Sequence, residues 1–189
     1  MRARAGRRMR DLAGDAEPRS VAAVVLAAGA ATRFGAPKQA LLLDEVLARL
    51  DRSREIGEIV VVAGAYELEA NAPLVRCDDW VLGPGASLRC GLRNLDDGTP
   101  AAAVILADGP DLAPAAVDRV VAAWRAGSGE VVAASYAGVR GHPVVLDRAV
   151  WPSVPDEGAR ALEPVLVPCD DLGSPGDVDR PEDLPARFR

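Results

Sequence analysis

Short apolar runs alternate with segments of helical period along the chain beyond residue 20. Seven runs have the features of β-strands, at residues 21–28, 58–63, 73–77, 102–107, 130–136, 142–146 and 165–167. Several of them are almost wholly apolar, which is typical of strands buried on both faces of a parallel sheet. We therefore expect an open, mostly parallel sheet with both faces covered.

Helical periods fall between these runs, at residues 41–50, 86–95, 114–126 and 157–162, with a brief helix after Pro181. Pro114 opens the third of them and Gly127 follows its end, as is usual at helix boundaries. Strands that alternate with helices predict βα units of an α/β fold. Neither a repeat nor a low-complexity linker divides residues 20–189, so we expect one domain there.

The composition is that of a globular protein, with 49% hydrophobic and 26% charged residues in a chain of 189. No apolar run reaches ~18 residues, and the first ten residues lack the apolar core of a secretory signal, so we expect no membrane partner. Cys77, Cys90 and Cys169 are odd in number and widely spaced. They predict neither a disulfide framework nor a zinc site, and they favour a cytoplasmic location.

The formal net charge of -6 is unevenly distributed. Residues 1–19 are basic, and we interpret them as a disordered tail or as the result of a start assigned too early, with Met9 as the true start. The rest of the chain is acidic, which argues against a nucleic-acid partner because phosphate binding in bulk needs a basic face. A nucleic-acid role for the tail alone stays open.

Two residue types occur once each. All basic residues other than Lys38 are Arg, and His142 is the one His of the chain. Both stand beside Gly and Pro, so we expect both in loops, and we expect Lys38 to be exposed to solvent.

The segment LAAGAATRFGAPK, residues 26–38, follows the first predicted strand. Backbone N–H groups of such a Gly-containing loop can cradle an anion, and cations can complete the neutralisation of a polyphosphate. The spacing matches neither GxxxxGK[ST] nor GxGxxG. From the residues alone, a plain strand-to-helix connection with solvated cations is an equal alternative.

This segment resembles the nucleotide-binding signature of the MobA-like NTP transferases, the group that contains the molybdenum-cofactor cytidylyltransferases. The resemblance implies a three-layer α/β/α Rossmann-like fold with a mixed, mostly parallel sheet and a small antiparallel part near residues 130–146. It also implies that the loop wraps a triphosphate and that Arg33 and Lys38 are catalytic residues that bind its oxygens. The implied nucleotide-binding residues of the loop are Leu26, Ala27, Ala28, Gly29, Arg33 and Lys38.

The stretch GPGASLRCGL, residues 83–92, is similar to the family's GxxxSLRxGL. The resemblance places Ser87 and Arg89 near the nucleotide. A serine before an apolar run is also a common helix cap, so Ser87 has that alternative role.

Two acidic motifs carry the implied metal site. LADGPDL, residues 106–112, looks like the family's LxDxP, which makes Asp108 a catalytic Mg²⁺ ligand, whereas Asp111 fits a helix start better. GDVDRPEDL, residues 176–184, resembles DIDTPEDL and adds Asp177 or Asp179 to the metal. We expect one of these two carboxylates to face the site and the other to turn away.

The acceptor side rests on weaker matches. RGHPVVL, residues 140–146, is similar to the family's GHP motif and makes His142 an acceptor-side residue, with a structural loop role as the alternative. PDEGARAL, residues 155–162, looks like GDxGAR and adds Asp156 and Arg160. One feature departs from the family: the GxPL hairpin that usually follows PK is missing from PKQALLLDEVLARL.

The resemblance implies a Mg²⁺-dependent nucleotidyltransferase that moves a nucleotidyl group from an NTP to a phosphorylated acceptor and releases pyrophosphate. CTP is the expected donor and molybdopterin or its molybdenum form the expected acceptor. Guanylyl transfer, a sugar-phosphate acceptor and a non-catalytic nucleotide-binding accessory protein remain alternatives.

Overall fold

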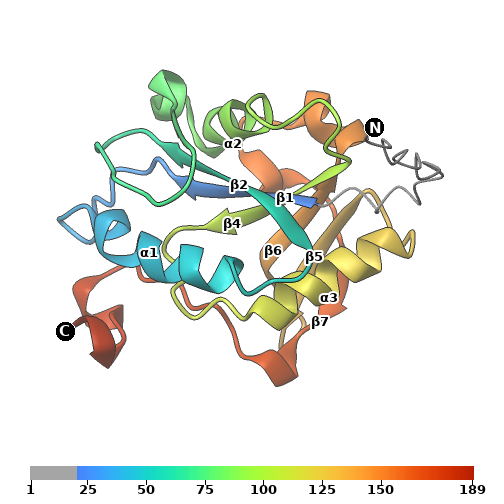
Figure 1. Cartoon of the computed structure of the whole chain (residues 1–189). Coiled ribbons are helices and arrows are strands. Elements are labelled where there is room, and N and C mark those ends of the chain that lie inside the picture. The colour runs from blue at the N-terminus through green and yellow to red at the C-terminus, as the bar shows by residue number, and fades with distance from the viewer. Residues whose placement is uncertain (1–20) are drawn as a thin grey trace, which may run out of the picture.

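The computed structural model describes residues 21–189, so the predicted basic tail, residues 1–19, lies outside the described residues. One sheet forms the centre of the molecule, with the strand order β3-β2-β1-β4-β6-β5-β7 (Figure 1). Its strands are β1 (Val21–Ala27), β2 (Ile56–Ala63), β3 (Leu74–Arg76), β4 (Ala101–Leu106), β5 (Val131–Tyr136), β6 (Val139–Asp147) and β7 (Val165–Pro168).

The sheet is mixed in the expected way. β6 pairs antiparallel with both β4 and β5, and every other pairing in the sheet is parallel. All seven predicted strands are present, and β6 begins three residues earlier than expected. His142 lies inside β6, which agrees with the predicted strand 142–146 and shows that the loop expected from its Gly and Pro neighbours was wrong.

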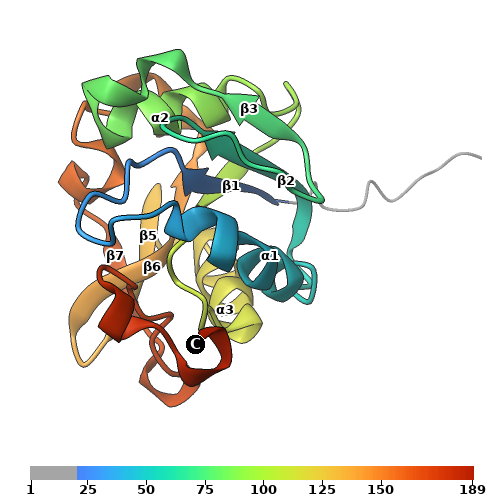
Figure 2. The same ribbon diagram turned by 90° about the vertical axis from the view of Figure 1, so that its left-hand side faces the viewer.

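Helices cover both faces and complete three layers (Figures 1 and 2). α1 (Lys38–Leu50) and α3 (Pro114–Arg125) lie on one face, and α2 (Pro84–Leu92) lies on the other. Val46 of α1 and Val120 of α3 are fully buried in the first core, and Leu88 of α2 is fully buried in the second. Burial of apolar surface on both faces explains the near-continuous apolar character of β1 and β4.

α2 packs unusually close to the sheet. A Cβ on Gly91 would lie 2.4 Å from Cγ1 of Val24 and 2.8 Å from Cγ2 of Val62. A side chain at this position could not be accommodated without movement of the helix, so glycine sets the distance between α2 and the strands. This close packing holds the C-terminal end of α2 against β1 and β2, while Pro84 and Ser87 in its first turns border the ends of β1 and β4.

The order of the strands predicts where a ligand binds. From β1 the chain crosses to β2 on one side, and β4 pairs with β1 on the other side. In open α/β sheets, ligands bind at the carboxyl ends of the strands where the order reverses in this way. The loop after β1 and the residues after β4 therefore lie side by side at the carboxyl ends of the strands.

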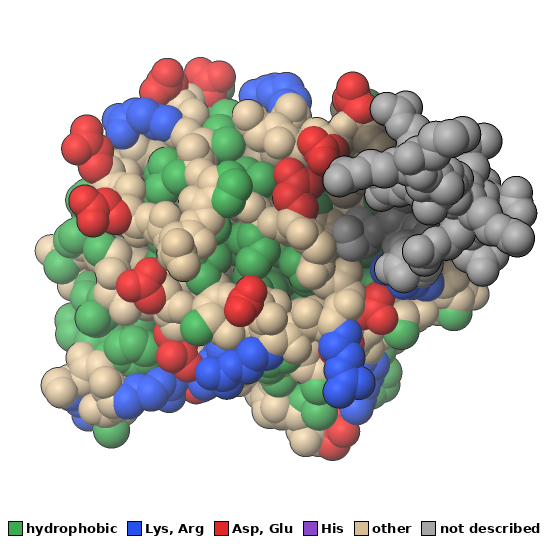
Figure 3. All heavy atoms as spheres, in the orientation of Figure 1, with side chains coloured by type: hydrophobic (Ala, Val, Ile, Leu, Met, Phe, Trp, Pro, Cys, Tyr) green, Lys and Arg blue, Asp and Glu red, His purple; other side chains and the backbone are tan. Residues whose placement is uncertain are grey.

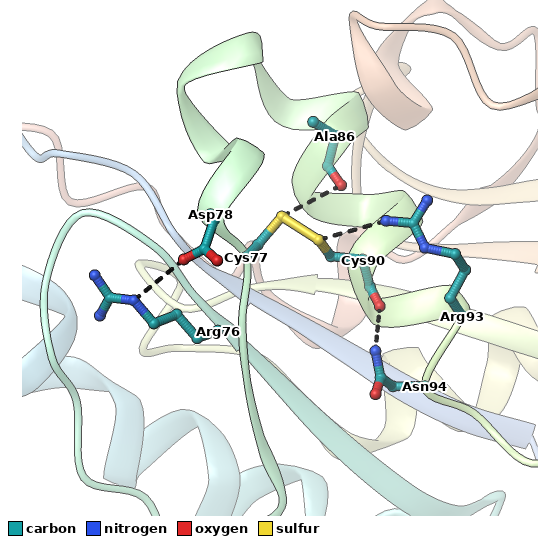
Figure 4. The surroundings of a disulfide bond; sticks show 7 residues. All are labelled: Arg76, Cys77, Asp78, Ala86, Cys90, Arg93 and Asn94. Carbon is teal, nitrogen blue, oxygen red and sulfur yellow. Dashed lines mark hydrogen bonds and ion pairs between the residues drawn. A yellow bond between two sulfur atoms is a disulfide. The ribbon is translucent and has the colours of Figure 1, made fainter.

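Cys77 and Cys90 form a disulfide, although the number and spacing of the cysteines predicted no disulfide framework. Figure 4 shows the bond between Cys77, just after β3, and Cys90 on α2, with the Ala86 carbonyl beside Cys77. The 13-residue separation concealed the pairing, because the chain turns back between the two residues and brings their Cα atoms to 5.9 Å. Cys169 is free and buried.

The C-terminal segment folds back onto the loop after β1. Val178 and Leu184 are buried against Leu42 of α1, and Phe34 and Phe188 pack on the same small cluster. Figure 2 shows this segment, in red, beside α1. The packing brings residues near 178 to the carboxyl ends of the strands, next to the loop after β1.

The surface carries charges of both signs. On the face drawn in Figure 3, acidic and basic side chains are interspersed among apolar ones. None of the helices between residues 21 and 189 has the length and hydrophobicity that a membrane span requires.

Candidate functional site

A cavity of about 330 Å³ lies at the carboxyl ends of β1 and β4. Its walls are mainly apolar, with few polar groups, which is the usual character of a small-molecule site. The lining residues are Leu26, Ala28, Gly29, Gln39, Trp80, Gly83, Pro84, Ser87, Leu106 and Asp108. Five of these are residues that the sequence indicated for the nucleotide or the metal. Ala27 belongs to the core of the opposite face and does not line the cavity.

Lys38 lies beside this cavity and is buried, with only 7% of its side chain exposed. Its ammonium group donates to Asp108 Oδ2 at 2.8 Å and to the Val178 carbonyl. The expectation of an exposed loop lysine was therefore wrong. The chain passes directly from Pro37 into α1, with no hairpin between, so Lys38 occupies the first helical position and points into the protein.

Arg33 is held at the outer edge of the site. Its side chain is 72% exposed, and Nη1 donates to Asp179 Oδ2 at 2.6 Å. Asp179 Oδ1 also lies 3.8 Å from Nζ of Lys38. The two predicted phosphate-binding cations thus share one carboxylate, and this carboxylate comes from the C-terminal segment.

Asp177 and Asp179 both belong to this cluster, contrary to the expectation that one would turn away. Val178 between them is buried against Leu42, and its N–H donates to the Asp108 carbonyl at 3.1 Å. Asp179 contacts Arg33 and Lys38 directly, and Asp177 lies close enough to Asp108 and Lys38 to interact with them electrostatically. Partial burial and the neighbouring Asp108 carboxylate raise the pKa of Asp177.

Three buried side-chain atoms within residues 21–189 have no hydrogen-bond partner, and all three lie at or beside this site. They are Gln39 Oε1, Asp108 Oδ1 and His142 Nδ1. Buried polar atoms are normally satisfied, so a group of unsatisfied atoms in one place indicates a position where a ligand supplies the missing partners. Asp108 Oδ1 has the chemistry of a cation ligand, and the residues present therefore fit a divalent ion.

His142 lies on β6, and its carbonyl accepts a hydrogen bond of 2.9 Å from the Tyr136 hydroxyl. Burial lowers the pKa of the His142 imidazole, and the Asp177 and Asp108 carboxylates partly oppose that effect. Hence the imidazole is neutral at neutral pH. The structure brings His142 within electrostatic range of the predicted metal ligands.

Ser87 and Arg89 have different surroundings from each other. α2 begins at Pro84, so Ser87 lies inside the helix rather than at its cap, and it lines the cavity. Arg89 instead donates to the Val154 carbonyl and to Asp156 Oδ1, both at 2.8 Å. These contacts join a predicted nucleotide residue to a predicted acceptor residue and fix α2 against the segment that follows β6.

Asp156 also contributes its backbone to this contact. Its carbonyl accepts from the N–H of Gly85 at 2.9 Å, and a Cβ on Gly85 would meet the Pro155 carbonyl at 2.0 Å. Arg160 is exposed on the short helical segment Gly158–Ala161, where its carbonyl accepts from Arg140. The backbone of Pro155 and Asp156 therefore covers the first turn of α2.

Sequence reasoning did not name the other five residues of the cavity; Gly83, Pro84 and Leu106 stand within the quoted motifs, whereas Gln39 and Trp80 stand outside those of the nucleotide and metal sites. Gln39 follows Lys38 directly and is 5% exposed. A polar residue at the start of a helix is ordinarily expected at the surface, so the sequence contained no signal of this burial. Trp80 packs against the end of β2, where a Cβ on Gly64 would lie 2.7 Å from its ring. No pattern in the sequence connects Trp80 to the loop after β1.

A larger cavity of about 690 Å³ opens beside β2 and β3. Asp44, Glu67 and Glu69 contribute three carboxylates to its lining, against one basic residue, Arg76. An acidic wall repels phosphate groups, so this cavity does not compete with the smaller one as a triphosphate site.

The described residues contain no group of three or more His, Cys, Asp or Glu arranged to hold a metal by themselves. Mg²⁺ is often bound by one or two carboxylates, with substrate phosphates and water completing its coordination. The cluster around Asp108 matches that kind of site rather than an all-protein cage.

A buried lysine, carboxylates and an apolar cavity at the switch point of an α/β sheet define a nucleotide-binding enzyme domain. The model of the MobA-like NTP transferase domain matches residues 23–166. The chain belongs to the MobA-like NTP transferase family, whose class of enzyme is the nucleotidyltransferases. This confirms the family resemblance of the sequence motifs.

Two curated relatives are similar to nearly the whole chain. A molybdenum cofactor guanylyltransferase of Mesorhizobium japonicum is 32% identical over 182 residues, which cover 90% of this chain and 84% of the relative. A nicotine blue oxidoreductase of Paenarthrobacter nicotinovorans is 31% identical over 212 residues, covering 90% and 98%.

Solved structures confirm the predicted fold. A homologue of Mycobacterium tuberculosis Rv0371c from Mycobacterium sp. strain JC1 superimposes with a TM-score of 0.73 at 25% identity, covering 88% of this chain and 94% of that chain. Rv0371c in complex with manganese has a TM-score of 0.66 at 24% identity, with coverage of 87% and 95%.

Proposed function

We propose that this protein transfers a nucleotidyl group from an NTP to a phosphorylated small-molecule acceptor. An acceptor phosphate oxygen attacks the α-phosphorus in line, the new O–P bond forms, and the bond to the bridging oxygen breaks to release pyrophosphate. The observation that carries this proposal is the group of unpartnered atoms beside the buried Lys38, at the switch point of the sheet.

In this proposal the protein acts by positioning and by charge neutralisation. Lys38 and Arg33 bind the triphosphate oxygens, and the loop from Leu26 to Gly29 borders the nucleoside. Asp108, with Asp177 and Asp179, holds a divalent cation, Mg²⁺ or Mn²⁺. Such a cation neutralises charge on the phosphate oxygens when it is bound.

The acceptor lies on the side of His142 in this scheme. Phosphate nucleophiles are ionised at neutral pH, so the reaction needs no strong general base. A neutral His142 can instead donate or accept a hydrogen bond to orient the acceptor. Asp156 and Arg160 remain acceptor-side candidates through the family motif, although Asp156 is also the partner of Arg89.

CTP as donor and a molybdopterin-type acceptor are supported by the family motifs. The guanylyltransferase relative supports GTP as the alternative donor. The oxidoreductase name of the second relative shows that similar chains carry names from more than one reaction class, so the transfer itself has to be measured.

A nucleotide screen followed by a product assay tests the proposal. Thermal unfolding is measured with CTP, GTP, ATP and UTP, each with Mg²⁺ or Mn²⁺, because a ligand that binds the native state raises its apparent stability. Pyrophosphate release is then measured with the preferred nucleotide and a molybdopterin acceptor. Binding with no release from any phosphorylated acceptor would support a non-catalytic accessory protein, and no binding by any nucleotide would exclude the proposed function.

A further inference from the structure

Gln39 has a side-chain amide whose orientation is fixed by one contact. Its Nε2 donates to the Gly29 carbonyl at 2.9 Å. The reverse orientation would place two carbonyl oxygens against each other, so the nitrogen must face Gly29. Oε1 is therefore the amide atom left for another partner, and it can only accept a hydrogen bond.

That oxygen has no partner in the protein. Gln39 is 5% exposed, and Oε1 is one of the three buried unpartnered side-chain atoms within residues 21–189. The cost of burying an acceptor is recovered only when a donor reaches it. Gln39 lines the cavity at the ends of β1 and β4, and a small shift of its side chain that opens Oε1 to the cavity would let a bound molecule supply the donor.

The cavity walls indicate which part of a nucleotide would bring that donor. Leu26, Leu106 and Pro84 supply apolar surface, and the half-buried Trp80 adds an aromatic ring. A flat nucleobase matches these walls, whereas a ribose or a phosphate would meet them with its polar groups. The charged groups, Lys38 and Asp108, lie where the triphosphate is proposed to bind.

We infer that Gln39 is a specificity-determining residue whose Oε1 accepts a hydrogen bond from an amino group of the nucleobase. The inference rests on the proposed function and narrows its donor to bases with an exocyclic amine. Cytosine, adenine and guanine carry one. Uracil has a carbonyl oxygen in the position of the cytosine amine, and two acceptors face to face repel each other.

Pairs of nucleotides that differ in one amino group test this assignment. Dissociation constants are measured by calorimetry with Mg²⁺ for CTP against UTP, and for GTP and ATP each against ITP. We expect the wild-type protein to bind the amino nucleotide of its preferred pair at least about tenfold more tightly, since a site built for a hydrogen bond rejects an analogue that lacks it. Equal affinities within every pair would overturn the inference while leaving the proposed function intact.

Two variants assign the effect to Gln39. Gln39→Met keeps the length of the side chain and removes both polar atoms, so the ratio within the preferred pair should fall to about one. Gln39→Glu keeps an acceptor oxygen but loses the donor to the Gly29 carbonyl, so a preference for the amino base that persists in this variant assigns the effect to the acceptor and not to the Gly29 contact. If Gln39→Met weakens both members of a pair equally, Gln39 merely supports Gly29 and the inference fails. If no nucleotide binds the wild-type protein, the proposed function fails together with it.

Discussion

The ammonium nitrogen of Lys38 lies 2.8 Å from the carboxylate of Asp108, although 70 positions separate the two residues in the chain. This contact joins the start of α1 to the end of β4. The Lys38 side chain is 7% exposed and that of Asp108 is 24% exposed, so solvent screens the pair only weakly. Residues proposed for phosphate and metal binding therefore also contribute to the stability of the fold.

Replacement of Lys38 should destabilise the protein. Lys38→Met leaves the Asp108 carboxylate without its cation in a largely buried position, and we expect the free energy of unfolding to fall by about 2 kcal/mol. Arg33→Met is the matched control, because Arg33 binds the same cluster from an exposed position and should cost less than about 1 kcal/mol. Urea denaturation measures both values, and equal losses would contradict the burial argument.

Asp108 should control the affinity for a divalent cation. We expect Asp108→Asn to lower Mn²⁺ affinity in the presence of the preferred NTP by about tenfold or more, since one anionic ligand is lost. The fold should persist because the Asn oxygen can still accept from Lys38. Asp111→Asn is the control, as Asp111 pairs with Arg187 at 2.7 Å and does not line the cavity. Unchanged Mn²⁺ binding, measured by electron paramagnetic resonance, would place the metal elsewhere.

The disulfide can be tested by counting the cysteine thiols that react with an alkylating reagent. In denaturant without reductant, alkylation should label Cys169 and leave Cys77 and Cys90 unlabelled; after reduction all three should react. Cys90→Ser opens a loop of 13 residues and should lower the free energy of unfolding by about 3 kcal/mol. Three reactive thiols before reduction would show that the bond is absent from the purified protein.

Alkaline stability should depend on Tyr136. Burial raises the pKa of its hydroxyl from 10.0 to about 12, with a further contribution from Cys169. The unfolded state therefore releases this proton at a lower pH than the folded state, so stability is lost as pH rises from about 10 towards 12. Tyr136→Phe should flatten the dependence of the free energy of unfolding on pH in this range. The variant also loses the hydrogen bond to the His142 carbonyl, and denaturation at pH 7, where the hydroxyl is not titrating, measures that loss separately. An unchanged slope between pH 10 and 12 would contradict the prediction.

Local patterns were enough to predict most of the elements. The apolar run at β1 and the Pro114 start of α3 produced ranges close to those in the structure, because burial on both faces and helix capping act on neighbouring residues. α1 begins three residues earlier than predicted, since Pro37 is followed directly by helix. Lys38 was therefore placed in a loop, and its burial was missed.

The sequence alone determined the α/β class, the family and the residues Lys38, Asp108 and Ser87 as members of one candidate site, because short motifs and hydrophobic periods are local properties. The tertiary structure decided which groups meet. The packing of Val178 on Leu42 brought Asp179 to Lys38, and the return of the chain after β3 paired Cys77 with Cys90. It also left Gln39 with a buried oxygen and no partner. These contacts join residues far apart in the chain, and no local spacing specifies them.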